Sequence, residues 1–395
     1  MLSARSRLLL LVLPNALANK QYNKSLLPEL YSNLQRNQRI FFSHHHSVTN
    51  QQQQTLSNVN VHETTHYKSH PTYQPGVPRI HPTDPKCNAL EGEVKYSPLK
   101  SLWYAGMSYT AIVGGILTFD PSLILQDLAV FIGTTGISIL FGHSLGMHRK
   151  FIHNSYECPK WLEYLLVHFG TLMGIAGPIG MMKAHDLRDW AQRQPPQQCH
   201  PYYGQQESFW KDAYWQMHCT FQLKHPPQVV LGENISQDKI FQFMEKTWML
   251  QQLPWALLFY ALGGWHWIIW GICARVAVCV HGHFFVGWYA HNHGPIQSRS
   301  YHVQNACIQG YNVKGWPYLG TSEFAQKLQA VMTAGECYHN NHHAYPGSAK
   351  LALKDDELDI GFKVLKMMEK LGLVWNLKLP KDLPSRPELQ KLDQE

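Results

Sequence analysis

The chain has 395 residues, of which 15% are charged and 12% are aromatic, and it carries a formal net charge of +7. A typical soluble domain has roughly 25% charged residues, so this composition favours a membrane protein. The excess positive charge does not form basic clusters with interleaved aromatic residues, which argues against nucleic-acid binding and fits a membrane surface. The eight cysteines include no CxxC pair, so the sequence predicts neither a zinc knuckle nor a disulfide framework.

The first part of the chain has the composition of a targeting segment. Residues 1–43 contain arginine, leucine and small residues but no acidic residue before Glu29, which is typical of an organellar transit peptide. We therefore predict that the protein lies in the mitochondrial inner membrane. The alternatives are the endoplasmic reticulum, reached by a secretory signal, and a plastid. Residues 44–95 are of low complexity and are predicted to form a disordered linker. An HExxH match at 62–66 falls inside this linker without an apolar stripe to support a helix, so we interpret it as coincidence.

Long apolar runs dominate the middle of the chain. They occupy 102–119, 123–146, 248–262 and 268–290. Each run approaches the roughly 20 residues needed to cross a bilayer, and Asp120-Pro121 and Gly263-Gly264 provide turns within the two pairs. Buried helical hairpins in a soluble protein are the alternative interpretation. A further run, 161–182, is interrupted by Gly177-Pro178 and is predicted to be one helix that lies at the interface or re-enters the membrane.

Four crossings imply a topology in which the polar segments share one side. Loop 147–247 and the chain after residue 291 then lie together, and the hairpin tips at 120–122 and 263–267 lie on the other side. The long loop carries several Lys and Arg residues whereas the tips have none, in agreement with the positive-inside rule. We therefore predict an all-α integral membrane protein with four transmembrane helices and a His-rich helical cap on one side. The predicted boundaries are 96–380 for this four-span domain and 381–395 for a C-terminal tail.

The stretch GECYHNNHHAYP at 335–346 predicts a metal site. His339, His342 and His343 stand at i, i+3 and i+4, which places them on one helix face. Neutral imidazoles that face one point are typical metal ligands, although a polar surface patch is the alternative. Further histidines occur where predicted spans end or in the large loop: His148, His153, His185 and His291. These seven imidazoles exceed the four ligands of a tetrahedral zinc and are compatible with a pair of irons.

The order of these motifs resembles that of the membrane fatty acid desaturases of the stearoyl-CoA desaturase type. GMHRKFIHNSY resembles the first histidine box, through His148 and His153, and GECYHNNHHAYP resembles the last box. VGWYAHNHG resembles the segment that supplies an isolated ligand, best matched by His291, and the whole resemblance covers about residues 100–375. The resemblance implies a four-span fold, a non-haem di-iron centre and O2-dependent removal of two hydrogens from a fatty acyl chain. It also implies that electrons come from an external carrier such as cytochrome b5 or ferredoxin.

The middle box departs from the family pattern. The family has HxxHH, whereas this chain has His185, Asp186, Leu187, Arg188 and Asp189 in succession. A guanidinium cannot bind a cation, so Arg188 is excluded as a ligand. Asp189 lies one helical turn from His185 and is predicted to be a ligand, with a role in orienting a neighbouring ligand as the alternative. Other histidines are candidates to compensate for the change: His143, His200, His293 and His302.

Polar residues near the histidine motifs are predicted to hold the imidazole N–H groups: Asp186, Glu336, Asn340 and Asn341. The function predicted from all these features is an O2-dependent di-iron desaturase that acts on a lipid. A lipid hydroxylase or monooxygenase on the same scaffold is the nearest alternative, since the same oxidant can insert oxygen instead. A non-catalytic, desaturase-like subunit of an organellar membrane complex is the other alternative. The altered middle box favours that alternative and the intact outer boxes oppose it.

Overall fold

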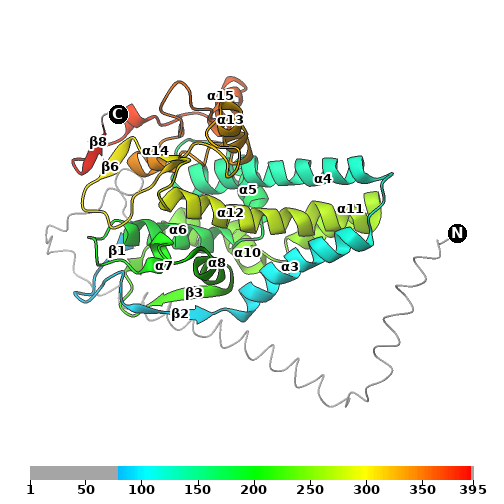
Figure 1. Ribbon diagram of the computed structural model, residues 1–395, viewed down its shortest axis with the longest axis horizontal. Helices are drawn as coiled ribbons and strands as arrows, with labels where there is room; N and C mark the ends of the chain where they lie inside the picture. Colours follow the sequence, from blue (N-terminus) through cyan, green and yellow to red (C-terminus); the bar gives the residue numbers. More distant parts are fainter. Residues whose placement is uncertain (1–78, 393–395) are drawn as a thin grey trace, which may run out of the picture. The chain divides into compact units, whose positions relative to one another are not determined.

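The structure of the protein, a computed structural model, describes residues 79–392 (Figure 1). This part of the chain is mostly helical, as predicted, with short two-stranded sheets added to the helices. The predicted transit peptide, the HExxH match and most of the predicted linker lie outside the described residues, so the predictions made for them stay predictions.

Several helices form a bundle that occupies the right-hand part of Figure 1. They are α3 (Pro98–Leu117), α4 (Ile124–Gly136), η1 (Ile137–Ile152), α11 (Gln252–Ile268), η2 (Ile269–Ala274) and α12 (Arg275–His291). α4 continues directly into η1, a stretch of wider π-helix, and α11 is followed directly by η2 and α12. η2 packs against α3, α4 and α11 and therefore holds these helices of the bundle together.

Two segments of this bundle are long and apolar enough to cross a membrane, Ile124–Ile152 and Gln252–His291. The second segment is divided by Gly264, whose φ of 64° and ψ of −149° are not helical. A Cβ atom on Gly271 would lie 2.8 Å from the ring of Phe259, so the helices on either side of Gly264 pack against each other. The turn predicted at 263–264 is therefore present.

Apolar side chains cover the outside of the bundle. Leu125, Leu257 and Ile116 are 80%, 74% and 72% exposed. A surface that exposes large apolar side chains on several neighbouring helices is unusual for a soluble protein and suits contact with lipid tails.

The apolar run 161–182 belongs to two helices and not to the single helix that was predicted. These are α5 (Lys160–Thr171) and α6 (Pro178–Gln192). Gly174, with φ of 73°, lies in the turn that separates them. α5 lies close to η1 because Gly146 has no side chain. A Cβ atom at this position would lie 2.4 Å from a backbone oxygen of α5. This packing holds the C-terminal end of η1, which carries the first histidine box.

The remaining elements form the cap, which gathers around the left-hand ends of the bundle helices (Figure 1). Its helices are α7 (Pro201–Gly204), α8 (Phe209–His218), α9 (Glu233–Ser236), α10 (Lys239–Thr247), α13 (Glu323–Met332), α14 (His339–Ala344), α15 (Ile360–Lys370) and η3 (Pro380–Asp382). Its strands are β1 (Ile80–His81), β2 (Gly92–Tyr96), β3 (Cys219–Leu223), β4 (Gln228–Val229), β5 (Gln297–Ser298), β6 (Tyr301–Val303), β7 (Asn312–Val313) and β8 (Leu389–Lys391). The antiparallel pairs are β1–β4, β2–β3, β5–β7 and β6–β8.

Strands correct two of the predicted boundaries. β1 and most of β2 lie within the predicted linker 44–95, yet they pair with β4 and β3. β8 lies within the predicted tail 381–395, yet it pairs with β6. The linker prediction failed here because a strand of a few residues has little compositional signal, while its partner lies far away in the sequence. Val94 of β2, for example, packs with Phe221 of β3 against a buried cluster of the cap.

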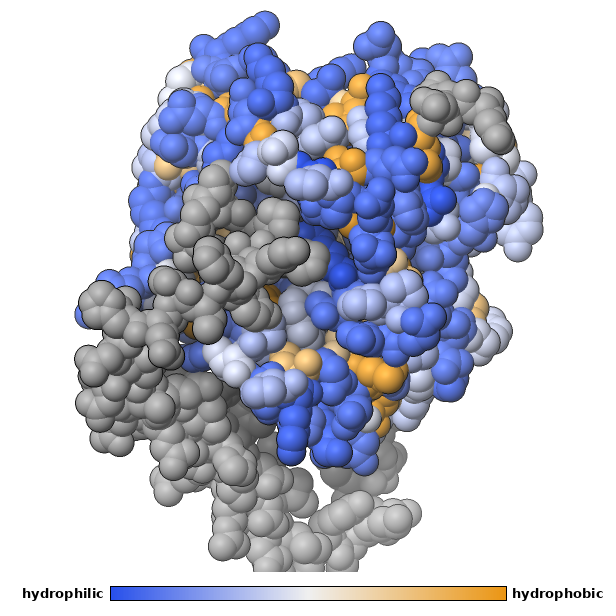
Figure 2. All heavy atoms as spheres, turned by 90° about the vertical axis from the view of Figure 1, so that its left-hand side faces the viewer, coloured by the Kyte–Doolittle hydropathy of each residue, from blue (hydrophilic) through white to orange (hydrophobic). Residues whose placement is uncertain are grey.

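The free end of the cap differs in polarity from the bundle. Figure 2 views the molecule from that end and shows a mostly hydrophilic face with small apolar patches. The bundle, with its exposed leucine and isoleucine side chains, is therefore the more apolar of the two regions at its surface.

Candidate metal centre

Four histidines converge at the junction of the bundle and the cap, and we call them group 1: His148, His153, His185 and His342. One ring nitrogen from each lies within 4.8 Å of those of the other three. They come from η1, from the residue that follows it, from α6 and from α14. The ring centroids of His148 and His342 are 4.5 Å apart, and those of His153 and His185 are 4.8 Å apart.

Three further histidines form group 2: His291, His339 and His343. Nε2 of His339 lies 3.1 Å from Nε2 of His291 and 2.9 Å from Nε2 of His343. A neutral imidazole carries only one N–H proton. Three Nε2 atoms that face one another therefore fit a shared cation better than a series of hydrogen bonds.

The last histidine box is divided between the two groups. The sequence predicted that His339, His342 and His343 face one point, whereas His342 belongs to group 1 and the other two to group 2. The reason is the helical period. Residues at i and i+4 are about 40° apart around a helix, while i+3 lies about 60° away on the opposite side. α14 therefore lies between the two groups and supplies both.

The two groups adjoin each other. The ring centroid of His342 lies 5.7 Å from that of His339 and 6.0 Å from that of His343. The structure therefore brings all seven predicted histidines into one cluster, although they come from four separate segments of the sequence.

The chemistry of these histidines fits a transition metal. Burial lowers the pKa of His339 to about 4, and it lowers the pKa of His153, the pKa of His342 and the pKa of His343 well below their ordinary value. The imidazoles are therefore neutral at pH 7 and have a free lone pair. Both ring nitrogens of His153 are buried and have no hydrogen-bond partner among the described residues. An unsatisfied buried polar group costs about 1–3 kcal/mol, and a bound cation would remove that cost for the nitrogen that carries the lone pair.

A carboxylate orients one histidine of group 1. Oε2 of Glu336 lies 2.7 Å from Nδ1 of His148. The other oxygen of Glu336 accepts a hydrogen bond of 2.6 Å from the hydroxyl of Ser144. If Nδ1 of His148 carries the proton and donates it in a hydrogen bond to Glu336, the lone pair of Nε2 is free to bind a metal. The contact between Glu336 and an imidazole N–H was predicted from the sequence.

The middle box contributes one residue to the two groups. His185 belongs to group 1, whereas Asp186 forms a buried ion pair with Arg79 at 2.6 Å. Arg188 donates a hydrogen bond of 2.7 Å to Oε1 of Gln216. Asp189 is in neither group, and its Oδ2 lies 3.6 Å from Nη2 of Arg193. The structure does not bring Asp189 among the histidines, and its assignment as a ligand stays a prediction.

The histidines that were considered as substitutes also lie outside both groups. His143 stacks on His148 at a centroid distance of 6.0 Å, and His200 stacks on Phe221 at 4.2 Å. His293 packs against Tyr311, and His302 lies in β6.

The asparagines of the last box do not contact the imidazoles in the way that was predicted. Asn340 bonds the backbone of Ser300 and Tyr301, and Asn341 bonds Asn312 and the backbone of Leu351. Both residues therefore connect α14 to β6, to β7 and to the chain at Leu351.

Two buried glutamines beside His291 were missed from the sequence. Nε2 of Gln192 lies 3.2 Å from Nε2 of His291, and Oε1 of Gln205 lies 3.4 Å from its Nδ1. Gln192 stands two turns after His185 on the same face of α6, a spacing that was available in the sequence. Gln205 follows the short helix α7 with a positive φ of 52°, and no motif marks it.

Comparison with known proteins identifies the family, although no family model matches the chain. An sn-1 stearoyl-lipid 9-desaturase of Synechocystis sp. is 30% identical over 289 residues, which cover 71% of this chain and 82% of that protein. The chain belongs to the fatty acid desaturase family. A second desaturase of that name, from Anabaena variabilis, is 28% identical over 71% of this chain and 93% of its own length. An acyl-CoA 5-desaturase of Anemone leveillei is 25% identical over 70% of this chain and 80% of its own.

Membership of the desaturase family confirms the resemblance and implies an oxidoreductase that acts on lipids. The names of these relatives give no support to the mitochondrial prediction, which rests on residues 1–43, outside the described part of the chain.

Proposed function

We propose that this protein is a membrane-bound oxidoreductase that uses O2 to introduce a double bond into a fatty acyl chain. The observation that supports the proposal most directly is the convergence of seven buried or half-buried histidines into two adjoining groups, in a chain of the desaturase family. The relatives named above act on stearoyl-lipid or acyl-CoA substrates, so the proposed substrate class is a lipid- or CoA-bound acyl chain.

Each group of histidines would hold one iron, group 1 through four imidazoles and group 2 through three. When bound, the pair of irons supplies, with O2, the oxidising power that removal of two hydrogens from an acyl chain needs. The chain's own residues position the ligands. Glu336 fixes the ring of His148, and α14 holds the ligands of both groups in one rigid helix.

For Asp189 we propose a role that differs from both predicted roles: it neither binds the metal nor orients a ligand, but acts through its charge. Its carboxylate lies beside Arg193, and its charge acts on His339, where it opposes the lowering of the pKa of that residue by burial. The negative charge of Asp189 would therefore stabilise positive charge at His339 without binding the metal itself.

The proposed membrane topology has four spans: α3, α4 with η1, α11 up to Gly264, and the helix from Gly264 through α12. Exposed apolar side chains on α3, α4 and α11 support it, as does the position of both hairpin tips at the end of the bundle that is remote from the histidines (Figure 1). We further propose that an external electron carrier, cytochrome b5 or a ferredoxin, approaches the hydrophilic face of the cap (Figure 2).

The purified full-length protein tests this proposal. We expect about two irons per chain by elemental analysis. We also expect new double bonds, detected by mass spectrometry, in the acyl chains of a host that expresses the protein. Hydroxylated acyl chains would support the monooxygenase alternative instead. A protein that binds no iron and changes no lipid would support the non-catalytic subunit.

A further inference from the structure

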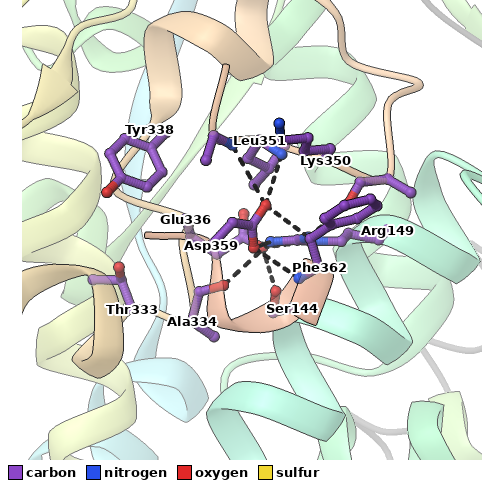
Figure 3. A network of polar contacts seen from close by, with 12 residues as sticks. Ser144, Arg149, Thr333, Ala334, Glu336, Tyr338, Lys350, Leu351, Asp359 and Phe362 are labelled. Atoms are coloured by element: carbon purple, nitrogen blue, oxygen red, sulfur yellow. Dashed lines mark hydrogen bonds and ion pairs between the residues drawn. The ribbon is translucent and has the colours of Figure 1, made fainter. Parts of the chain in front are cut away.

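The arginine of the first histidine box lies in a buried network next to group 1 (Figure 3). Arg149 is 1% exposed, and its two terminal nitrogens lie 2.9 and 3.2 Å from the two oxygens of Asp359. The same nitrogens donate to the backbone oxygens of Ala349 and Ala334, at 2.6 and 3.2 Å. Arg149 therefore connects η1 to the chain on both sides of α14.

Asp359 is equally buried, with 3% of its surface exposed. Besides Arg149 it accepts hydrogen bonds from the backbone N–H of Leu351 at 2.7 Å and of Phe362 at 2.8 Å, the latter at the start of α15. Figure 3 shows Asp359 between these three partners. Both carboxylate oxygens are thus used, and Asp359 is the closest acidic partner of Arg149.

The chain has two glycines where the ion pair needs space. A Cβ atom on Gly335, whose φ is 91°, would lie 2.7 Å from Oδ1 of Asp359. A Cβ atom on Gly361 would lie 2.7 Å from Nη2 of Arg149. Any side chain at either position would push the two charged groups apart.

The network reaches the metal ligands through Glu336. Nε of Arg149 lies 3.5 Å from Oε1 of Glu336, and the other oxygen of Glu336 lies 2.7 Å from Nδ1 of His148. Arg149 and His148 therefore share one carboxylate. If Asp359 lost its charge, the buried guanidinium of Arg149 would have Glu336 as its only carboxylate among the described contacts. An unpaired buried charge is costly, so Arg149 would draw Glu336 away from His148.

We propose that Asp359 is a positioning residue for group 1, and this inference rests on the proposed function. By neutralising Arg149, Asp359 leaves Glu336 in place to orient His148. No histidine box contains Asp359, which lies sixteen residues after His343. The alternative is that Asp359 only anchors the start of α15, and the two roles differ in what they predict for bound iron.

The first test is Asp359→Asn in the full-length protein, with iron per chain as the readout. We expect the loss of about one of two irons, because group 1 loses an oriented ligand while group 2 is untouched. Asp356→Asn is the matched control, since Asp356 is exposed, pairs with Lys314 and lies outside the network. The control should keep all its iron. A folded Asp359→Asn protein with full iron would overturn the inference.

The second test is rescue by the double variant Arg149→Gln with Asp359→Asn. It removes the competing guanidinium, so Glu336 stays with His148 and the iron of group 1 should return. The double variant also leaves no unpaired buried guanidinium, so it decides the matter even where Asp359→Asn alone fails to fold. A double variant that folds with one iron, or that fails to fold, would contradict the positioning role of Asp359. An iron-free wild-type protein would instead contradict the proposed function itself.

Discussion

The two histidine groups use the same kind of ligand in different surroundings. Group 1 has four imidazoles, and the carboxylate of Glu336 holds the N–H of His148. Group 2 has three imidazoles, and the neutral amides of Gln192 and Gln205 flank His291. A single helix, α14, supplies ligands to both groups, so the difference between them arises from their neighbours.

This difference has a chemical consequence. A carboxylate that accepts a hydrogen bond from an imidazole makes the imidazole a stronger donor to a metal, and a neutral amide does so less. We therefore expect two unequal sites, with the metal of group 1 held more tightly. The altered middle box contributes to this inequality, because the position where the family has a histidine is occupied by Asp189, outside both groups.

Removal of a ligand should have the largest effect on both groups. His153→Ala is expected to remove the iron of group 1, and His291→Ala that of group 2. Desaturation should be lost completely in each case, because the proposed function needs both irons. Iron analysis and product analysis of the two variants check this prediction. His302→Ala serves as the control, since His302 lies in β6 outside both groups. Retention of both irons in either ligand variant would contradict the assignment of that group.

Asp189→Asn should have the next largest effect on desaturation activity. If the carboxylate acts on group 2 from a distance, the variant keeps both irons and loses activity by about 10–100-fold. The readouts are iron per chain and the turnover of the iron-loaded protein. Loss of one iron in Asp189→Asn, with its return in Asp189→His, would show instead that Asp189 is a ligand.

Replacement of a glutamine beside group 2 should have a smaller effect on bound iron. Gln205→Leu removes the acceptor near Nδ1 of His291, so iron affinity at group 2 is expected to fall by about 10-fold, while group 1 is unchanged. Titration with Fe(II) measures the two affinities. Gln329→Leu is a control of the same chemistry, because Gln329 is buried in α13 and lies outside both groups. An equal loss of iron affinity in both groups would contradict the claim that Gln205 acts on group 2 alone.

Much of this architecture could be predicted from the sequence. The apolar runs predicted the long helices, and the Gly263-Gly264 pair predicted the turn that the structure places at Gly264. The histidine motifs predicted all seven residues of the two groups. These features succeed because they depend on local periodicity and on residue types that have few other uses.

The remainder depends on contacts between distant segments, which leave no local signal. The helical period separates His342 from His339 and His343, but which other histidines join each side depends on how η1, α6 and α12 pack. The partner of Arg149 is Asp359, 210 positions away, and no motif joins them. β2 and β8 were predicted to be outside the folded domain because their partner strands are remote in sequence.

The most direct test of the two-group centre compares two adjacent residues. His342 and His343 are neighbours in the sequence but belong to different groups. We predict that His342→Ala and His343→Ala each lose about one of two irons, and that Mössbauer spectra show a different iron signal missing in each variant. Loss of the same signal in both variants, or full iron in either, would contradict the division of the centre into two groups.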